Sequence, residues 1–124
     1  MSGLLSKIHV LDLSRVLSGP WATQMLADFG ADVIKVERPG IGDDVRQQGA
    51  RLKDRTGAQT QERSTFLALN RGKRSIAIDM AKPSGQRLIR RLAACADVVV
   101  ENFKAGDLAR YGLDHASLAR VNPK

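Results

Sequence analysis

The chain has 124 residues, 43% of them hydrophobic and 27% charged, so it is long enough for one domain with a modest core and is not broadly disordered. Its formal net charge of +7 favours an anionic partner: a nucleotide, a phosphate-bearing cofactor, a nucleic acid or an acidic protein. The single cysteine, Cys95, excludes an internal disulfide and indicates a reducing cytoplasm, and no apolar run is long enough for a signal peptide or a membrane span.

The first third of the chain predicts a strand–helix–strand unit after a loose lead-in at residues 1–7. Residues 8–13 and 33–36 are rich in Val, Ile and Leu, the nearly continuous apolar pattern of parallel strands covered on both faces. The crossover between two such strands should be right-handed. The turn after the first strand lacks GxGxxG and contains Pro20, which has no N–H, so a dinucleotide pyrophosphate bound there in the usual way is not expected.

The helix of this unit is predicted to begin near Pro20 and to end at Gly30, a length of about ten residues. Proline suits the first helical turn because the N–H that it lacks is not needed there. Trp21, Met25 and Phe29 recur at four-residue spacing, so the sequence predicts that they form one apolar face of this helix.

Residues 39–65 are polar, rich in Gly, Gln and Arg, and have no sustained period. We therefore expect a long loop, which in a compact domain is usually functional or mobile. Two interpretations stay open: a flexible surface loop, or a loop ordered by a ligand or a partner subunit. Arg38, in the turn before this stretch, is either an ordinary solvated arginine or a ligand for a phosphate group.

The second half of the chain predicts two further strands alternating with helices. In chain order these are a strand at 75–80, a helix at 83–94, a strand at 97–100, a helical turn at 106–111 and a short last helix after Asp114. The basic turn at 71–74 is expected to be solvated, and Cys95 to be a small buried residue rather than a reactive thiol.

Four strands alternating with helices predict an α/β fold with a Rossmann-like parallel sheet and flanking helices. In such sheets ligands bind beyond the carboxyl ends of the strands, so we expect an anion site at residues 14–16, 37–39, 79–80 and 101–103. A metal is not expected, because the two histidines stand alone and no Cys/His cluster exists. Nucleic-acid binding is disfavoured, because the basic residues are spread along the chain and aromatics are few.

Four segments of the sequence resemble, in order, the N-terminal part of class III CoA-transferases, the CaiB/BaiF family that includes formyl-CoA transferase. They read VLDLSRVLSGPWATQMLADFGADVIKVERPGIGDD, LNRGKRSIAIDM, ADVVVENFKAGDLARYGLD and VNPK. The resemblance covers nearly the whole chain except a variable loop at 41–63. It implies that residues 1–124 are the CoA-binding, Rossmann-like first part of a large domain, with the family's second domain and C-terminal segment absent.

The resemblance implies an enzyme that moves CoA between carboxylic acids, with coenzyme A or an acyl-CoA and a carboxylic acid as substrates and no metal. In that family an aspartate attacks the thioester and forms a mixed anhydride, and two subunits interlock as a homodimer. The aspartate lies downstream of the position that VNPK matches, so no catalytic residue is assigned here. Two alternatives stay open: an α-methylacyl-CoA racemase-like fragment, or a truncated fragment with no catalytic activity.

The resemblance also implies a CoA site built from residues at the four strand ends. In chain order they are Val16, Leu17, Ser18, Arg38, Ile78, Asp79, Met80, Ala81, Asn102, Phe103, Lys104 and Arg110. The first three would line the nucleotide site and Arg38 would approach the phosphates. Residues 78–81 would flank the adenine, 102–104 would form the loop after the last strand, and Arg110 would add positive charge.

Overall fold

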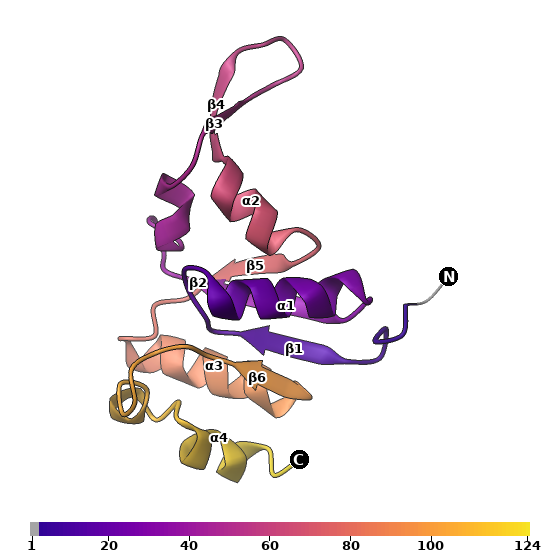
Figure 1. Cartoon of the computed structure of the whole chain (residues 1–124). Coiled ribbons are helices and arrows are strands. Elements are labelled where there is room, and N and C mark those ends of the chain that lie inside the picture. Colours follow the sequence, from indigo (N-terminus) through magenta and orange to yellow (C-terminus); the bar gives the residue numbers. More distant parts are fainter. Residues whose placement is uncertain (1–2) are drawn as a thin grey trace.

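The structure, a computed structural model, describes residues 3–124, and its strands and helices alternate along most of the chain (Figure 1). In chain order the elements are β1 (His9–Asp12), α1 (Ser18–Asp28), β2 (Asp32–Glu37), η1 (Asp44–Gln47), β3 (Arg51–Lys53), β4 (Gln59–Arg63), α2 (Ser64–Asn70), β5 (Arg74–Ala77), α3 (Pro83–Ala94), β6 (Val98–Val100), η2 (Ala109–Tyr111) and α4 (His115–Val121). The elements η1 and η2 are short 3-10 helices.

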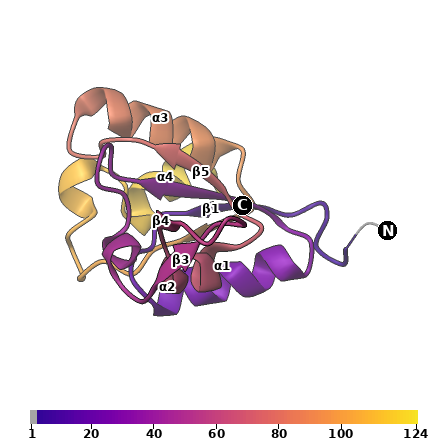
Figure 2. The same cartoon turned by 90° about the horizontal axis from the view of Figure 1, so that it is seen from above.

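Four strands form one parallel sheet in the order β5-β2-β1-β6, which confirms the predicted α/β fold with a Rossmann-like sheet. Figure 2 shows α1 and α3 on opposite faces of this sheet. Because helices cover both faces, the strands can be apolar on both sides, as their sequences indicate. Within residues 3–124, no helix combines the length and the apolar character that crossing a bilayer requires.

Each face of the sheet has its own core. On the α3 side, Leu11 and Val36 pack with Ile89 of α3 and Leu118 of α4. On the α1 side, Val10 and its register partner on β2 pack against the helix. Successive residues of a strand point to opposite faces, so a short strand such as β1 supplies both cores.

The apolar face predicted for α1 is not the face that packs on the sheet. Its three large side chains are about half exposed, at 58%, 52% and 52%: Trp21, Met25 and Phe29. The buried residues of the helix are Gly19, Pro20, Thr23 and Gln24. The reason lies in the sheet, because β1 and β2 present Asp12 and Lys35 as buried register partners. Small and polar helix residues can approach these charged groups and form hydrogen bonds with them.

Replacement of Trp21 tests this exposed position. We expect Trp21→Gln to lower the free energy of unfolding by no more than about 1 kcal/mol, because more than half of the side chain is already in water. Ile89→Ala removes a fully buried side chain and should cost about 2–5 kcal/mol. Urea unfolding followed by circular dichroism compares the two, and equal losses would contradict the exposed position of Trp21.

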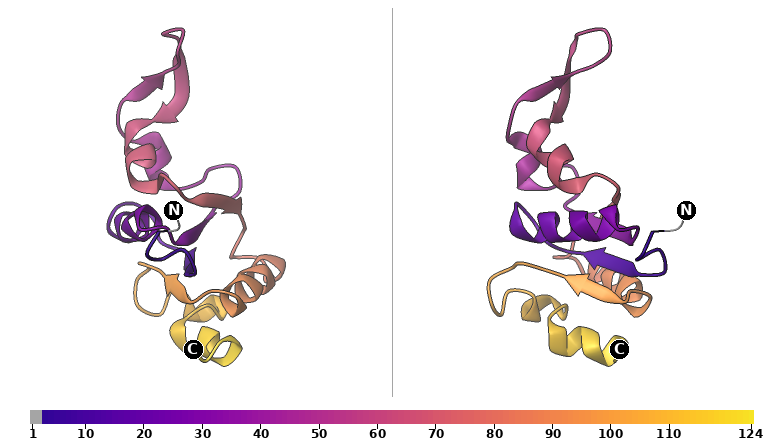
Figure 3. Two further views of the ribbon diagram at one scale, coloured as in Figure 1. Left: turned by 90° about the vertical axis from the view of Figure 1, so that its right-hand side faces the viewer. Right: turned by 45° about the vertical axis from the view of Figure 1, so that its right-hand side comes forward.

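Residues 39–65 are not the structureless loop that the sequence predicts. They contain η1, the antiparallel hairpin of β3 and β4, and the first residues of α2. The hairpin stands away from the sheet in both views of Figure 3, and the Asp54 carboxylate closes its turn by accepting hydrogen bonds from Thr56 and Ala58. Most residues of both strands are exposed, so the sequence carries no apolar alternation that would reveal them.

Three local expectations also need correction. Cys95 is exposed rather than buried, because it lies just beyond the last buried position of α3, Ala93. In the basic turn, Arg71 is exposed as expected, but the Lys73 side chain is 2% exposed. The lead-in is not loose at residues 3–7, where the Leu5 N–H donates to the Phe29 carbonyl at 3.0 Å; residues 1–2 lie outside the described part.

Candidate functional site

A cavity of about 200 Å³ lies at the carboxyl ends of the parallel strands. Its lining comes from the chain that follows each of the four strands: Arg15 after β1, Arg38 after β2, Met80 after β5 and Phe103 after β6. Open parallel sheets bind ligands at this edge because the strand ends and the loops after them converge there. This cavity is therefore the candidate ligand site.

The structure brings together seven of the twelve residues predicted to contact CoA. Those that line the cavity are Arg38, Ile78, Asp79, Met80, Ala81, Phe103 and Arg110. The other five are exposed and do not line it. Val16, Leu17 and Ser18 lie at the entry to α1, and Asn102 and Lys104 lie in the loop after β6.

The cavity also has lining residues outside the set that the family resemblance implies, among them Arg15, Glu37, Asp43, Asp107 and Tyr111. The first two fall within the strand-end segments 14–16 and 37–39, where the rule that ligands bind at strand ends predicted an anion site. Asp43 lies in the irregular stretch before η1, and only the fold brings it to this edge.

Three arginines line the cavity beside four carboxylates: Arg15, Arg38 and Arg110, with Glu37, Asp43, Asp79 and Asp107. The Arg15 guanidinium lies 4.5 Å from the centre of the Phe103 ring, and that of Arg110 lies 4.9 Å from the Tyr111 ring. Stacking of this kind fixes the guanidinium plane while its edge can still donate to an anion. Arg38 forms an ion pair with Asp44, so a phosphate bound to Arg38 would have to displace that carboxylate.

Asn102 holds the loop after β1 by two hydrogen bonds to one residue. Its side-chain oxygen accepts from the Arg15 backbone N–H at 2.8 Å, and its side-chain amide donates to the Arg15 carbonyl at 2.6 Å. With both groups of the amide used in this way, Asn102 joins the loops after β1 and β6 and fixes the backbone of Arg15 beside the cavity.

A buried polar network lies between the sheet and α1. Asp12, which is 0% exposed, accepts hydrogen bonds from Ser14, from the Thr23 hydroxyl at 2.5 Å and from Lys73 Nζ at 3.1 Å. Lys73 Nζ also donates to the Pro20 carbonyl at 2.8 Å. Burial lowers the pKa of Lys73, and the nearby Asp12 carboxylate opposes that shift. The network thus ties β1, α1 and the segment before β5 together.

Glu37, at the end of β2, is the acceptor for three donors. Arg46 forms a two-bond ion pair with it, at 2.7 and 2.8 Å; the Ser75 hydroxyl and the Asp43 N–H also donate to it. Burial by itself would raise the pKa of Glu37, but these hydrogen bonds outweigh it and lower the pKa from 4.5 to about 2. Glu37 is therefore ionised and fully engaged at neutral pH.

The low pKa of Glu37 predicts a loss of stability in acid. A carboxyl whose pKa is depressed on folding stabilises the fold above its unfolded pKa and loses that contribution as pH falls through the folded value. The Glu37 contribution, about 3 kcal/mol, should be complete above pH 5 and fall away toward pH 2. Urea unfolding from pH 7 to 2 should show a smaller acid loss in Glu37→Gln, and in Ser75→Ala a smaller loss that is complete at a higher pH, because the folded pKa of Glu37 rises without the Ser75 hydrogen bond. An unchanged profile in both variants would contradict this assignment.

Comparison with known families identifies the chain. The sequence model of CoA-transferase family III matches residues 5–124, nearly the whole chain. The chain belongs to this family. Its membership confirms the resemblance drawn from the four sequence segments.

The chain is similar to proteins that are named as CoA-transferases. The succinate–glutarate CoA-transferase of Agrobacterium fabrum is 54% identical over 120 residues, which cover 97% of this chain and 30% of that protein. The succinyl-CoA:glutarate CoA-transferase of Mus musculus is 44% identical over 119 residues, which cover 96% of this chain and 26% of the mouse protein. The chain therefore spans between a quarter and a third of the length of these relatives.

A crystal structure from the same family supports the fold. A CaiB/BaiF family protein from Brucella suis is 48% identical and superposes with a TM-score of 0.88, over 98% of this chain and 32% of that one. The agreement extends over almost every described residue. The arrangement of the sheet and its flanking helices is therefore the family's arrangement.

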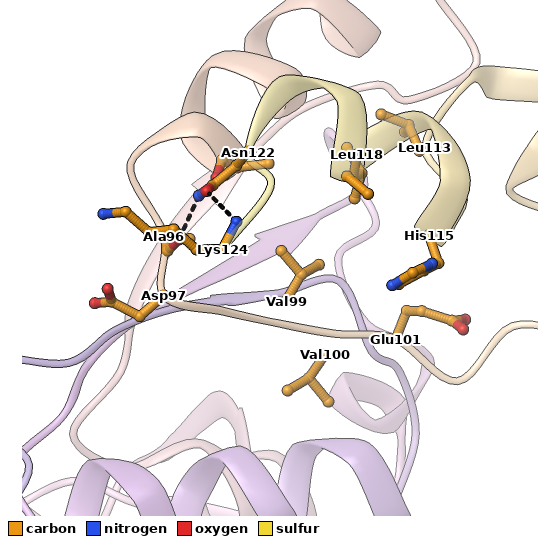
Figure 4. A pocket seen from close by; sticks show the side chains of 12 residues that line it. Ala96, Asp97, Val99, Val100, Glu101, Leu113, His115, Leu118, Asn122 and Lys124 are labelled. Atoms are coloured by element: carbon orange, nitrogen blue, oxygen red, sulfur yellow. Dashed lines mark hydrogen bonds between the residues drawn. The ribbon is translucent and has the colours of Figure 1, made fainter.

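A second, larger cavity of about 430 Å³ lies beside β6, on the side away from β1 (Figure 4). Figure 4 shows Val99 of β6 and Leu118 of α4 pointing toward each other across it. The charged residues at its border, Asp97, Glu101 and Lys124, are exposed. This cavity is the larger of the two, but it runs along the edge strand β6 and no arginine lines it. We therefore place the ligand in the cavity at the carboxyl ends of the strands. Among residues 3–124 there is also no group of three side chains suited to hold a metal.

Proposed function

We propose that this chain is the CoA-binding part of an acyl-CoA:carboxylate CoA-transferase, with residues 1–124 forming the first, Rossmann-like portion and 41–63 its variable segment. The observation that carries the proposal is the cavity at the strand ends, which Arg15, Arg38 and Arg110 line in a chain of CoA-transferase family III. CoA carries several phosphate charges, and the chain has a formal net charge of +7.

The cavity residues suggest how CoA would be held. Arg38 would exchange its ion pair with Asp44 for a phosphate, and the stacked arginines would donate to the remaining phosphate oxygens. Residues 78–81 would supply the wall for the adenine. Val16, Leu17, Ser18 and Lys104 would contact the ligand where it extends beyond the cavity.

No covalent step is assigned to the residues of this chain. Two cavity carboxylates, Glu37 and Asp43, are held in ion pairs by Arg46 and Lys35, so neither is free to attack a thioester. The substrates proposed for the whole protein are an acyl-CoA and a carboxylic acid. Two relatives are named for transfer between succinate and glutarate, so dicarboxylates are the first acceptors to test.

A homodimer is proposed for the whole protein. The support in this chain is the exposed apolar row along α1 and the residue that follows it, formed by Trp21, Met25 and Phe29. A cytoplasmic location is also proposed, on the ground that the single Cys95 can form no internal disulfide. Sedimentation of the whole protein tests the first proposal, and localisation of a tagged copy in cells tests the second.

Calorimetric titration of the chain with CoA tests the proposed function. We expect binding that adenosine 3′-phosphate 5′-diphosphate competes away and that weakens as salt rises, because phosphates carry the charge. Arg38→Met should weaken binding about tenfold, the effect of losing a charge-assisted hydrogen bond of roughly 1.5 kcal/mol. Absence of any CoA binding would contradict the proposal.

Arg74→Met is the matched control for Arg38→Met. Arg74 is likewise an exposed arginine in an ion pair, with Asp32, but it lies at the opposite ends of the strands from the cavity. The Arg74→Met variant should leave the affinity for CoA unchanged. An equal loss in both variants would mean that the arginines act only through the overall charge of the chain, and would count against a site at the cavity.

A further inference from the structure

Val16 stands in an unusual backbone conformation. It is the one non-glycine residue among residues 3–124 with a positive φ, at 68°. For an L-residue the left-handed region costs roughly 1–2 kcal/mol, because Cβ approaches the following carbonyl oxygen, and a β-branched side chain is among the least suited to it. Other interactions must therefore hold Val16 in this conformation.

Asp43 supplies that interaction. The Val16 N–H donates to both oxygens of the Asp43 carboxylate, at 3.1 and 3.3 Å. Asp43 is 2% exposed, and its Oδ2 lies 2.8 Å from Nζ of Lys35, which is 1% exposed. A buried carboxylate accepting a backbone N–H forms a strong, charge-assisted hydrogen bond.

The same lysine holds the other side of the turn. Lys35 Nζ donates to the Ser14 carbonyl at 3.0 Å, so one ammonium group fixes Ser14 directly and Val16 through Asp43. Arg15 lies between these two anchors and lines the cavity. Since Asn102 binds the Arg15 backbone as well, the turn after β1 is held from two sides.

The contacts of the buried Lys35–Asp43 pair with the turn after β1 indicate a role other than stabilising the fold. Replacing a buried ion pair with apolar residues of similar volume is often neutral or stabilising, so such a pair is weak evidence for a purely stabilising role. Here the pair contacts the backbone on both sides of a site residue and holds a strained one.

We propose that Asp43, held by Lys35, is a positioning residue for the CoA site: the pair keeps Val16 left-handed and thereby fixes Arg15 and the entry to α1 in the geometry that binds CoA. This role rests on the proposed function. Neither residue needs to touch CoA, because both act through the backbone from Ser14 to Val16.

The first test replaces both charges together, in Lys35→Met with Asp43→Ala, so that no buried charge is left unpaired. NMR couplings and chemical shifts of residue 16 report its φ in the free chain. We expect φ to leave the positive region and the affinity for CoA to fall about 5- to 30-fold, the equivalent of the 1–2 kcal/mol of backbone strain. In the double variant, a φ that stays positive overturns the proposal, whatever its affinity for CoA. An unsubstituted chain that keeps a positive φ at residue 16 and binds no CoA refutes the proposed function instead.

The second test asks whether glycine removes the need for the pair. Glycine adopts positive φ without the Cβ penalty, so the loss of affinity caused by the double replacement should shrink several-fold when it is made in a Val16→Gly background. A pair with a merely structural role would cost the same affinity in both backgrounds, which would overturn the proposal.

A control and a milder variant complete the design. Asp32→Ala with Arg74→Met removes an exposed pair at the far end of the strands and should change neither φ at residue 16 nor the affinity. If the double replacement fails to fold, Lys35→Met with Asp43→Asn takes its place, because it keeps the shape of residue 43, weakens the acceptor and leaves no buried charge unpaired. An unchanged φ and an unchanged affinity in that variant would overturn the proposal.

Discussion

Asp12→Ala is expected to lower the free energy of unfolding by about 3–5 kcal/mol, a large part of the stability of a typical domain. Asp12 is 0% exposed and is the one carboxylate that pairs with Lys73. Removing it leaves Lys73 buried with only neutral acceptors, the Pro20 carbonyl and the Asn70 side chain. It also leaves the Thr23 hydroxyl without its short hydrogen bond to β1.

A double variant distinguishes the cost of leaving Lys73 buried without its partner from the cost of losing the Asp12 side chain. Asp12→Asn with Lys73→Met removes both charges and should cost less than Asp12→Ala alone, because no buried charge is left unpaired. Urea unfolding followed by circular dichroism measures both. The control is Asp32→Ala, which breaks an exposed pair with Arg74 and should cost no more than about 1 kcal/mol. If Asp12→Ala also cost no more than about 1 kcal/mol, the stabilising role of the buried network around Asp12 would be refuted.

Gly85→Ala is expected to damage stability and ligand binding together. A Cβ on Gly85 would lie 1.9 Å from the carbonyl oxygen of Asp79 and 2.7 Å from its carbonyl carbon. Both are backbone atoms, so the first turn of α3 and the segment after β5 must move apart. We expect a loss of about 1–3 kcal/mol, because two packed backbones are forced out of contact. The displaced segment lines the cavity, so affinity for CoA should fall about tenfold or more.

Thermal unfolding and calorimetry with CoA measure the two effects of Gly85→Ala. Ser84→Ala is the matched control, since it adds no atom and alters an exposed position in the same helical turn. It should leave both quantities nearly unchanged. A Gly85→Ala chain as stable and as tightly binding as this control would show that α3 can shift without moving the wall of the cavity.

The α/β fold was predictable because its signals are local. The helix predicted at 83–94 has the bounds of α3, Pro83–Ala94, since a proline marks its first turn and apolar residues recur at helical spacing. Three strands of the parallel sheet, β1, β2 and β6, are short runs rich in apolar residues, and the order of the strands in the chain limits the topology to a few arrangements. Hairpin β3–β4 escaped prediction because a mostly exposed hairpin has no apolar periodicity.

The candidate site was predictable only in part. The rule that ligands bind at strand ends, together with the family resemblance, selects Arg38, the 78–81 segment and Phe103, all of which line the cavity. The roles of other residues depend on partners distant in the chain. Asn102 is engaged by Arg15, 87 positions earlier, and Asp43 by the buried Lys35.

The sequence by itself therefore determined the fold class, the four strands, the helix α3 and the family, because these follow from local patterns of apolar residues, turns and motifs. Only the tertiary structure decided which polar groups are buried and which apolar ones are exposed. Asp12 and Lys73 lie 61 positions apart and become a buried pair only when β1 and the segment before β5 meet. Trp21 is exposed because that charged interior takes the small, polar side of α1. The polarity of a side chain indicates whether, on its own, it prefers water or the protein interior. Whether it is buried in the fold depends on the hydrogen-bond and ion-pair partners that the fold brings to it.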